Sequence, residues 1–297
     1  MRFKVEGIIA AMVTPFTQGG DFVDYDKVAP LAACMEKKGA GGLFPCGTTG
    51  EGHLCNTEER KTILEEVVAA VTKKVRVIAH TGAMDTATTI ELTQHARKAG
   101  AYGAAVVTPS FYGYDDEALF LYYKAVADSV PGFPVLLYNI PSCAKNALSA
   151  DLICKLADSA ENIVGVKDSS GSMPFLTRLF GQTTNGFAVI NGSDEQGYQA
   201  LVAGGKAVVS GSSNAYIDLY VELYNQVKKG NLKKAWQAQL RLEKACRLFT
   251  YGGGLAALKE IMRHRTVDGG YVRPPQRELT SAEKKRIAKG LEEQGLI

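Results

Sequence analysis

The stretches PVLLYNIP at 134–141 and IVGVKD at 163–168 decide the fold of this chain. Each is a short run of almost uninterrupted apolar residues that ends in polar or turn-forming residues. Strands that are apolar at nearly every position, rather than at alternate ones, are buried on both faces, which is typical of a parallel sheet. We therefore interpret the two stretches as strands of a parallel sheet in an α/β protein.

Runs of the same kind recur along the chain on both sides of this pair. They are GIIAAMVTPF (7–16), AGGLFPCGTT (40–49), VRVIAHTG (75–82), YGAAVVTPS (102–110), FAVINGSD (187–194) and KAVVSGSSN (206–214). Segments of helical character lie between them, for example 56–74 and 86–100. In the first of these, Asn56 or Thr57 with Glu59 offers an N-cap signal.

The alternation of strands and helices predicts βα units. Eight such units in one chain close a (β/α)8 TIM barrel. An open doubly wound sheet is the alternative, but that fold usually carries a Gly-rich dinucleotide turn after its first strand. TPFTQGG at 14–20 is not such a turn, so the barrel is the favoured architecture.

The pattern changes after the eighth run. Residues 217–248 predict one long helix, 253–265 a second and 280–294 a third, with an RPP turn at 273–275. A minimal barrel needs only one helix after its last strand. We therefore predict a (β/α)8 barrel at 1–216 and a C-terminal helical extension at 217–297, whose role is packing or oligomer contact rather than catalysis.

Composition argues against several kinds of partner. The 297 residues are 46% hydrophobic and 22% charged, with a net charge of +3. The Lys and Arg residues form no basic stripe, so neither nucleic acid nor a membrane surface is an expected partner. The apolar runs reach about ten residues, well short of a membrane span. Six cysteines without a CxxC pair predict free thiols and a cytoplasmic location.

Lys167 is the unexpected residue among the strand ends, where a barrel carries its functional groups. Its neighbours Ile163, Val164 and Val166 are typical of a barrel core, and an ammonium buried there is costly without a partner. One interpretation is structural, with the lysine paired to Asp168 or another neighbouring carboxylate. The other is chemical, because burial favours the neutral amine, which attacks a ketone and forms an imine.

Imine chemistry also needs a proton shuttle and a group that holds a substrate carboxylate. Tyr138 ends the preceding strand and can supply the shuttle, although a buried tyrosine there is also a normal core residue. The turn GTTGE at 47–51 presents backbone N–H groups and two hydroxyls to an anion, although many such turns are only loop structure. The three features occur on the ends of three strands of one barrel, which favours the chemical interpretation.

The ordered set of GTTGE at 47–51, YNIP at 138–141 and GVKDSSG at 165–171 resembles the N-acetylneuraminate lyase and dihydrodipicolinate synthase family of class I aldolases. The resemblance covers essentially the whole barrel and reaches the RPP turn. It implies pyruvate as the common keto acid, an aldehyde as the second substrate or product, no metal, no organic cofactor and a homotetramer.

The resemblance also implies roles for individual residues. Lys167 would be the Schiff-base lysine and Tyr138 the proton relay, with Thr49 as the third member of the catalytic set. Thr48 and Thr49 would bind the carboxylate of the keto acid. The seventh predicted strand ends in GSDE at 192–195, which is similar to the stretch by which sialic acid lyases hold substrate hydroxyls.

Two positions depart from the pattern of the dihydrodipicolinate synthases. Those synthases carry an arginine shortly after the YNxP strand, and Cys143 stands there in this chain. A thiol cannot reproduce the bidentate hold of a guanidinium on a carboxylate, and Lys145 is a poor geometric substitute. The synthases also use a tyrosine from the neighbouring subunit, and here Phe111 occupies that position with Tyr112 next to it.

The acidic end of the seventh strand favours a sugar acid. Carboxylates and a serine hydroxyl suit a polyol, and they would repel the carboxylate of aspartate semialdehyde. Asp194 and Glu195 are equally suited to cap the following helix. GVKDSSG likewise resembles the lysine strand of 2-keto-3-deoxy sugar acid aldolases. The predicted substrate-binding residues are Thr48, Thr49, Gly192, Asp194, Glu195 and Ser210.

We therefore predict a pyruvate-dependent class I aldolase that reversibly cleaves sialic acid or a 2-keto-3-deoxy sugar acid to pyruvate and an aldehyde. The alternatives are 4-hydroxy-tetrahydrodipicolinate synthase, which condenses pyruvate with aspartate semialdehyde, and a sugar-acid dehydratase that uses the same imine. A metal-dependent aldolase is disfavoured because, of four histidines, only His80 lies at a strand end and His53 near one. A barrel that only binds ligands would not need Lys167.

Overall fold

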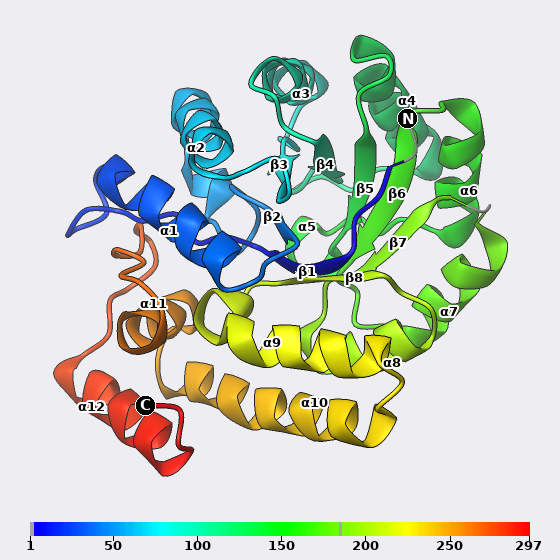
Figure 1. Cartoon of the computed structure of the whole chain (residues 1–297). Coiled ribbons are helices and arrows are strands. Elements are labelled where there is room, and N and C mark those ends of the chain that lie inside the picture. Colours follow the sequence, from blue (N-terminus) through cyan, green and yellow to red (C-terminus); the bar gives the residue numbers. More distant parts are fainter. Residues whose placement is uncertain (1–2, 184–185) are drawn as a thin grey trace.

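The predicted strands close into a parallel barrel (Figure 1). The computed structural model describes residues 3–183 and 186–297, and within these ranges eight strands pair in chain order, with the last returning to the first. The (β/α)8 barrel is confirmed, and the open doubly wound alternative is wrong. The strands are β1 (Gly7–Ala10), β2 (Gly42–Leu43), β3 (Arg76–His80), β4 (Gly103–Val107), β5 (Val135–Asn139), β6 (Ile163–Asp168), β7 (Ala188–Asn191) and β8 (Ala207–Ser210).

Helices alternate with the strands and cover the outside of the barrel (Figure 1). The helix predicted within 56–74 is α2 (Thr57–Ala70). Its N-cap is Asn56, whose side chain accepts from the Glu59 N–H while the Glu59 carboxylate accepts from the Asn56 N–H. The other helices of this layer are α1 (Tyr25–Lys37), α3 (Thr86–Lys98), α4 (Asp116–Ser129), α6 (Ala150–Ser159), α7 (Met173–Gln182) and α8 (Gly197–Val202). The short helix α5 (Pro141–Ala144) and the 3₁₀ helices η1 (Gly52–Leu54) and η2 (Asp194–Gln196) belong to the connections after β5, β2 and β7, and Ala144 of α5 packs with the side chains inside the barrel.

The single long helix predicted at 217–248 is wrong. Two helices, α9 (Ser213–Lys228) and α10 (Leu232–Cys246), lie side by side there (Figure 1). Gly230 between them has a φ of +74°, a left-handed conformation that ends a helix and that glycine adopts without a Cβ clash. The predicted boundary at residue 216 falls inside α9, which is the helix of the eighth βα unit.

The rest of the extension has the predicted helices. The 3₁₀ helix η3 (Arg247–Tyr251) leads from α10 into α11 (Gly254–Arg265), and α12 (Ser281–Glu293) follows. The helices predicted at 253–265 and 280–294 are confirmed. Among the described residues, none of the helices has the length and apolar character that a membrane crossing requires.

Apolar side chains form two clusters, one on each side of the strand wall. The larger cluster lies between the strands and the helices, and the smaller one fills the inside of the barrel. Val166 of β6 belongs to the outer cluster. Because successive side chains of a strand point to opposite faces, Lys167 points into the barrel. The parallel register pairs Lys167 with Tyr138 of β5 and with Ile190 of β7, so lysine and tyrosine meet at the same level of the barrel.

Candidate active site

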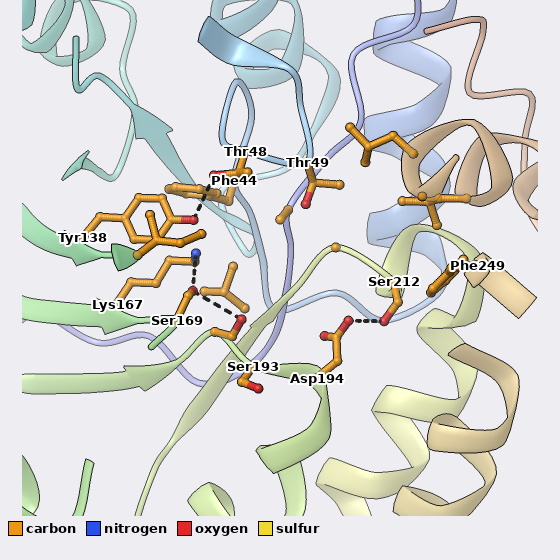
Figure 2. Close-up of a pocket in the computed structure, with 18 residues that line it drawn as sticks. Phe44, Thr48, Thr49, Tyr138, Lys167, Ser169, Ser193, Asp194, Ser212 and Phe249 are labelled. Atoms are coloured by element: carbon orange, nitrogen blue, oxygen red, sulfur yellow. Dashed lines mark hydrogen bonds between the residues drawn. The ribbon is translucent and has the colours of Figure 1, made fainter. Parts of the chain in front are cut away.

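A cavity of about 410 Å³ opens at the carboxyl ends of the strands (Figure 2). This is the end at which barrel enzymes carry their active sites. It gathers side chains from several strand ends and from the C-terminal extension. Its lining is Ala11, Phe44, Thr48, Thr49, Tyr138, Ile140, Lys167, Ser169, Gly192, Ser193, Asp194, Val209, Gly211, Ser212, Phe249, Gly254, Leu255 and Leu258.

Lys167 is buried at the floor of this cavity, with 5% of its surface exposed. Its Nζ donates to the Ser169 Oγ at 3.1 Å and makes no ion pair with any carboxylate of the described residues. The Asp168 carboxylate accepts instead from the Asn139 amide at 2.7 Å and from the Ser170 hydroxyl at 2.8 Å. The interpretation of Lys167 as a salt-bridge partner of Asp168 is therefore wrong.

Asp168 lies on the outer side of the same strand end. Burial raises the pKa of the Asp168 carboxyl, while the hydrogen bonds from Ser170 and Asn139 oppose that shift. The carboxyl thus orders the loop after β6, and it leaves the lysine amine available to the cavity.

Tyr138 stands beside the lysine and is 2% exposed. Its ring packs edge-on against Phe44 and His80, with centroid distances of 5.8 and 5.9 Å. Its hydroxyl lies 3.2 Å from the Thr48 Oγ1, and both groups line the cavity (Figure 2). The Tyr138 ring therefore packs in the core, while the Tyr138 hydroxyl faces the cavity.

The GTTGE turn is held in an unusual backbone conformation. Glu51 has a φ of +52°, and Cys46, just before the turn, has a φ of +57°. The Glu51 N–H donates to the Thr48 carbonyl at 3.1 Å, and the Thr14 hydroxyl donates to the Gly50 carbonyl at 2.6 Å. These bonds order the turn whose Thr48 and Thr49 side chains line the cavity, and their role in carboxylate binding stays a prediction.

Two glycines leave room for the reactive groups. A Cβ on Gly192 would overlap the Ser169 Oγ and lie 3.3 Å from the Lys167 Cε. A Cβ on Gly211 would likewise overlap the Thr49 Oγ1. Ser169, the partner of Lys167, and Thr49 therefore occupy space that a larger residue at these strand ends would fill.

Asp194 is the one carboxylate of the cavity lining among the described residues. Its Oδ2 accepts from the Ser212 hydroxyl at 2.6 Å, and that hydroxyl lies 2.7 Å from the Tyr220 hydroxyl. Its Oδ1 is buried without a hydrogen-bond partner. Asp194 and Glu195 lie in the first turn of η2, where neither η2 nor α8 has a side-chain hydrogen bond from its N-cap residue. The alternative role of the two carboxylates at the helix N-terminus stays a prediction.

Two of the predicted substrate-binding residues lie outside the cavity. Glu195 is exposed and does not belong to the lining of this cavity. Ser210 is buried, where its Oγ accepts from the Ser213 N–H at 3.0 Å. Val209 belongs to the inner cluster, so the next side chain along β8 faces outward.

The C-terminal extension closes one side of the cavity, which the sequence did not indicate. Phe249 of η3 and Leu255 and Leu258 of α11 form an apolar wall opposite the strand ends. Ser169, Ser193 and Ser212 also line the cavity, although they are not among the predicted substrate-binding residues. The run of hydroxyls that follows Lys167 was visible in the sequence, whereas no local pattern marks Phe249.

Neither departure from the synthase pattern lies in the cavity lining. Cys143 is an exposed residue of α5, and Phe111 and Tyr112 are 69% and 62% exposed in the loop after β4. Their rings contact each other edge-on with centroids 5.0 Å apart. Whether a neighbouring subunit covers them stays a prediction.

His80 lies against the guanidinium of Arg60. Its Nδ1 lies 3.3 Å from an Arg60 Nη2, and that guanidinium also donates to the carbonyls of His80 and Gly82. Burial lowers the pKa of His80 well below its usual range, and the Arg60 charge lowers it further. Among the residues that the structure describes, His, Cys, Asp and Glu form no group of three that could hold a metal ion.

A buried lysine next to a tyrosine and a hydroxyl-rich turn, at the mouth of a (β/α)8 barrel, is typical of Schiff-base-forming class I aldolases. The chain belongs to the dihydrodipicolinate synthetase family, whose family model matches residues 4–294. It is thus an enzyme of the Schiff-base-forming lyase and synthase type that includes the N-acetylneuraminate lyases.

Individual relatives span the whole chain. The 4-hydroxy-tetrahydrodipicolinate synthase of Methanopyrus kandleri is 31% identical over 100% of this chain and 99% of its own. A prophage protein of the dihydrodipicolinic acid synthase family from E. coli K12, solved with pyruvate, is 31% identical with a TM-score of 0.91 over 98% of this chain and 99% of its own. A sialic acid aldolase of Ruminococcus gnavus is 26% identical with a TM-score of 0.93 over 100% and 99%.

These relatives do not support the two predicted activities equally. The curated relatives of highest similarity are mostly named as the synthase that we gave as an alternative, while the sialic acid aldolase is a structural neighbour at lower identity. By this measure the synthase is favoured over a lyase of sugar acids.

Proposed function

We propose that the enzyme forms an imine between the Lys167 amine and the ketone of pyruvate, and that it makes or breaks the bond between the pyruvate methyl carbon and an aldehyde. The amine attacks the ketone carbon, and the carbonyl oxygen leaves as water. In the cleavage direction the adjacent carbon–carbon bond breaks, its electrons enter the iminium as an enamine, and the hydroxyl of the departing group loses its proton to become the aldehyde. Protonation of the enamine and addition of water to the imine then release pyruvate.

Tyr138 is the proposed proton carrier in this sequence. Its hydroxyl is within reach of the Thr48 hydroxyl and on the cavity side of the ring. General acid and base groups must lie within hydrogen-bond reach of the proton they move, and the position of this hydroxyl beside Thr48 in the cavity supports the proposal. Thr48, Thr49 and the N–H groups of the GTTGE turn are the proposed binding site of the pyruvate carboxylate.

We further propose that the aldehyde is neutral and hydroxylated. The observation that carries this proposal is the Asp194 carboxylate, which belongs to the cavity lining and whose Oδ1 has no hydrogen-bond donor. A carboxylate oxygen accepts hydrogen bonds from substrate hydroxyls and repels a second carboxylate. Lys167 is the only cation of the cavity lining among the described residues, so a second substrate carboxylate would find no partner there.

The second candidate is 4-hydroxy-tetrahydrodipicolinate synthase, in which the aldehyde is aspartate semialdehyde. The names of the curated relatives support it. The exposed Cys143, at the position where those synthases carry an arginine, counts against it, because a thiol offers no bidentate hold on a carboxylate.

The deciding experiment offers pyruvate together with one of three aldehydes: N-acetylmannosamine, glyceraldehyde or aspartate semialdehyde. Turnover with one of the first two supports the neutral aldehyde, and turnover confined to aspartate semialdehyde supports the synthase. Lys167→Ala is the blank for each aldehyde. Cys143→Arg is the matched variant, and it should raise use of aspartate semialdehyde without improving the use of glyceraldehyde.

Three further properties belong to this proposal. The imine itself supplies the electron sink, so the reaction needs no metal or organic cofactor. A homotetramer is supported by the exposed aromatic pair Phe111 and Tyr112, and light scattering would test it. A cytoplasmic location is supported by the six cysteines, which are all free.

A further inference from the structure

One buried lysine of the C-terminal extension is joined to the carboxylate-binding turn. Lys259 of α11 is 1% exposed. Its Nζ donates to the Glu51 Oε1 at 2.7 Å, to the Thr14 carbonyl at 2.7 Å and to the Tyr271 carbonyl at 2.6 Å. An ammonium has three N–H donors, so every one of them is used.

Glu51 ends the GTTGE turn, and its side chain is 0% exposed. Besides Lys259, its carboxylate accepts from the Arg273 backbone N–H and from the Gln276 amide, both at 2.9 Å. These three partners lie 208, 222 and 225 residues further along the chain. Within the described ranges 3–183 and 186–297, every hydrogen-bond donor to this carboxylate thus belongs to the extension.

Two short chains of hydrogen bonds connect the ion pair to the turn at the cavity wall. Along the backbone, the left-handed Glu51 donates its N–H to the carbonyl of Thr48, whose hydroxyl faces the Tyr138 hydroxyl. Through space, Thr14 accepts from Lys259 with its carbonyl and donates with its hydroxyl to the Gly50 carbonyl. Both routes end on the residues that follow β2.

We infer that Lys259 is a positioning residue of the active site: through Glu51 it fixes the turn that binds the keto-acid carboxylate. This inference rests on the proposed function of the turn at 47–51. A left-handed conformation at a residue other than glycine persists only where its surroundings hold it. The partners of Glu51 are the contacts that hold it here.

The turn at 47–51 depends strongly on the ion pair because both of its groups are charged and buried. A buried carboxylate that loses its cation is left with a desolvated, unpaired charge, and the chain relieves this by moving the carboxylate toward water. Burial lowers the pKa of Lys259, and the Glu51 carboxylate opposes that shift, so the lysine also depends on its partner. Loss of either group therefore displaces the turn that carries Thr48 and Thr49.

The test measures trapping of the imine by borohydride as a function of pyruvate concentration. In Lys259→Met the half-saturating pyruvate concentration should rise at least tenfold, while the extent of trapping at saturation stays within about twofold of the wild type. Glu51→Gln keeps the shape of the side chain and should shift the same quantity in the same direction, and it replaces Lys259→Met if that variant does not fold. Lys155→Met, which removes an exposed ion pair with Glu117, is the matched control and should behave as wild type.

Acetone separates positioning from general stability, because it forms the same imine but has no carboxylate. Both variants should trap acetone at Lys167 as the wild type does. Half-saturation by pyruvate within twofold of wild type in folded Lys259→Met or Glu51→Gln would overturn the inference, and so would an equal loss with acetone. If the wild type itself is not trapped by pyruvate, the proposed function fails instead.

Discussion

The Lys167 Nζ lies 3.5 Å from the centre of the Tyr138 ring, so the amine faces the flat side of the aromatic ring and not its hydroxyl. The ring face attracts a cation, which holds the lysine in one place before substrate arrives. The hydroxyl is directed instead toward Thr48. In the proposed mechanism one tyrosine therefore serves two purposes: its ring orients the amine, and its hydroxyl, beside Thr48, carries a proton.

Removal of the hydroxyl should separate these two purposes. Tyr138→Phe keeps the ring against Lys167, so pyruvate binding and imine trapping should remain within a few-fold of wild type. Turnover should fall about 10²- to 10⁴-fold, the usual worth of a general acid or base. Steady-state kinetics with borohydride trapping in parallel would measure both. Unchanged turnover would remove Tyr138 from proton transfer.

Lys167→Ala should abolish covalent capture of pyruvate. Wild-type enzyme treated with pyruvate and borohydride should gain the mass of one reduced adduct, and peptide mapping should place it on Lys167. The alanine variant should gain none. An adduct on another lysine in either protein would contradict the assignment.

The glycine beside the lysine should not tolerate even a methyl group. Gly192→Ala would place a Cβ in the space of the Ser169 Oγ and 3.3 Å from the Lys167 Cε. Displacement of a reacting group by about 1 Å costs on the order of 100-fold in rate, so imine formation should slow by about that factor. Gly181→Ala in α7 is the control, because a Cβ there meets nothing within 4 Å. Equal trapping rates in the two variants would show that the space is not needed.

Asp194 should act on the aldehyde half of the reaction alone. Asp194→Asn removes a charged acceptor, so the KM of the aldehyde should rise about 10- to 100-fold, the worth of a hydrogen bond to a charged group. Pyruvate trapping should not change. Glu195→Gln, on an exposed side chain outside the cavity, should match wild type. A loss of pyruvate trapping in Asp194→Asn would place the carboxylate on the wrong half of the reaction.

His80 should make stability depend on pH below neutrality. Burial and Arg60 lower its pKa in the folded protein from the ordinary 6.5, so only the unfolded chain takes up a proton there as pH falls below about 6.5. The free energy of unfolding should therefore decrease as pH falls, by up to about 1.4 kcal/mol per pH unit for this group. His80→Gln should reduce the slope. The pKa of His53 is lowered in the same way and contributes a slope that remains in the variant.

Urea unfolding of both proteins between pH 5 and 8 would measure the difference. The two curves should run parallel above about pH 7, where histidine is neutral in both states. Parallel curves over the whole range would contradict the buried neutral His80.

The barrel and the candidate reactive lysine could be predicted because the sequence patterns that indicate them are local. Each apolar run is complete within a few residues, and a lysine among Ile163, Val164 and Val166 is conspicuous wherever that strand lies. The capping box at Asn56 and Glu59 is local as well. The break at Gly230 was missed because the helical pattern of apolar residues continues on both sides of it, and a single glycine is compatible with a helix interior.

The candidate site could be predicted only in part, because the sequence does not show where each side chain points or which distant segments contact each other. Ser210 stands at a strand end, yet the two-residue period of β8 turns it away from the cavity. Phe249, Leu255 and Leu258 reach the cavity only through the way the extension folds back, which no spacing in the sequence records. Glu51 was seen as part of a turn, but its partner Lys259 is 208 residues away.

The bond between Glu51 and Lys259 also sets an order of events during synthesis. A ribosome releases all eight strands, together with Tyr138 and Lys167, before Lys259, Arg273 and Gln276 have left its exit tunnel. A nascent chain at that stage lacks all three residues that donate to the Glu51 carboxylate. Under the proposed function, the binding site of the keto-acid carboxylate is therefore complete only when translation is almost finished.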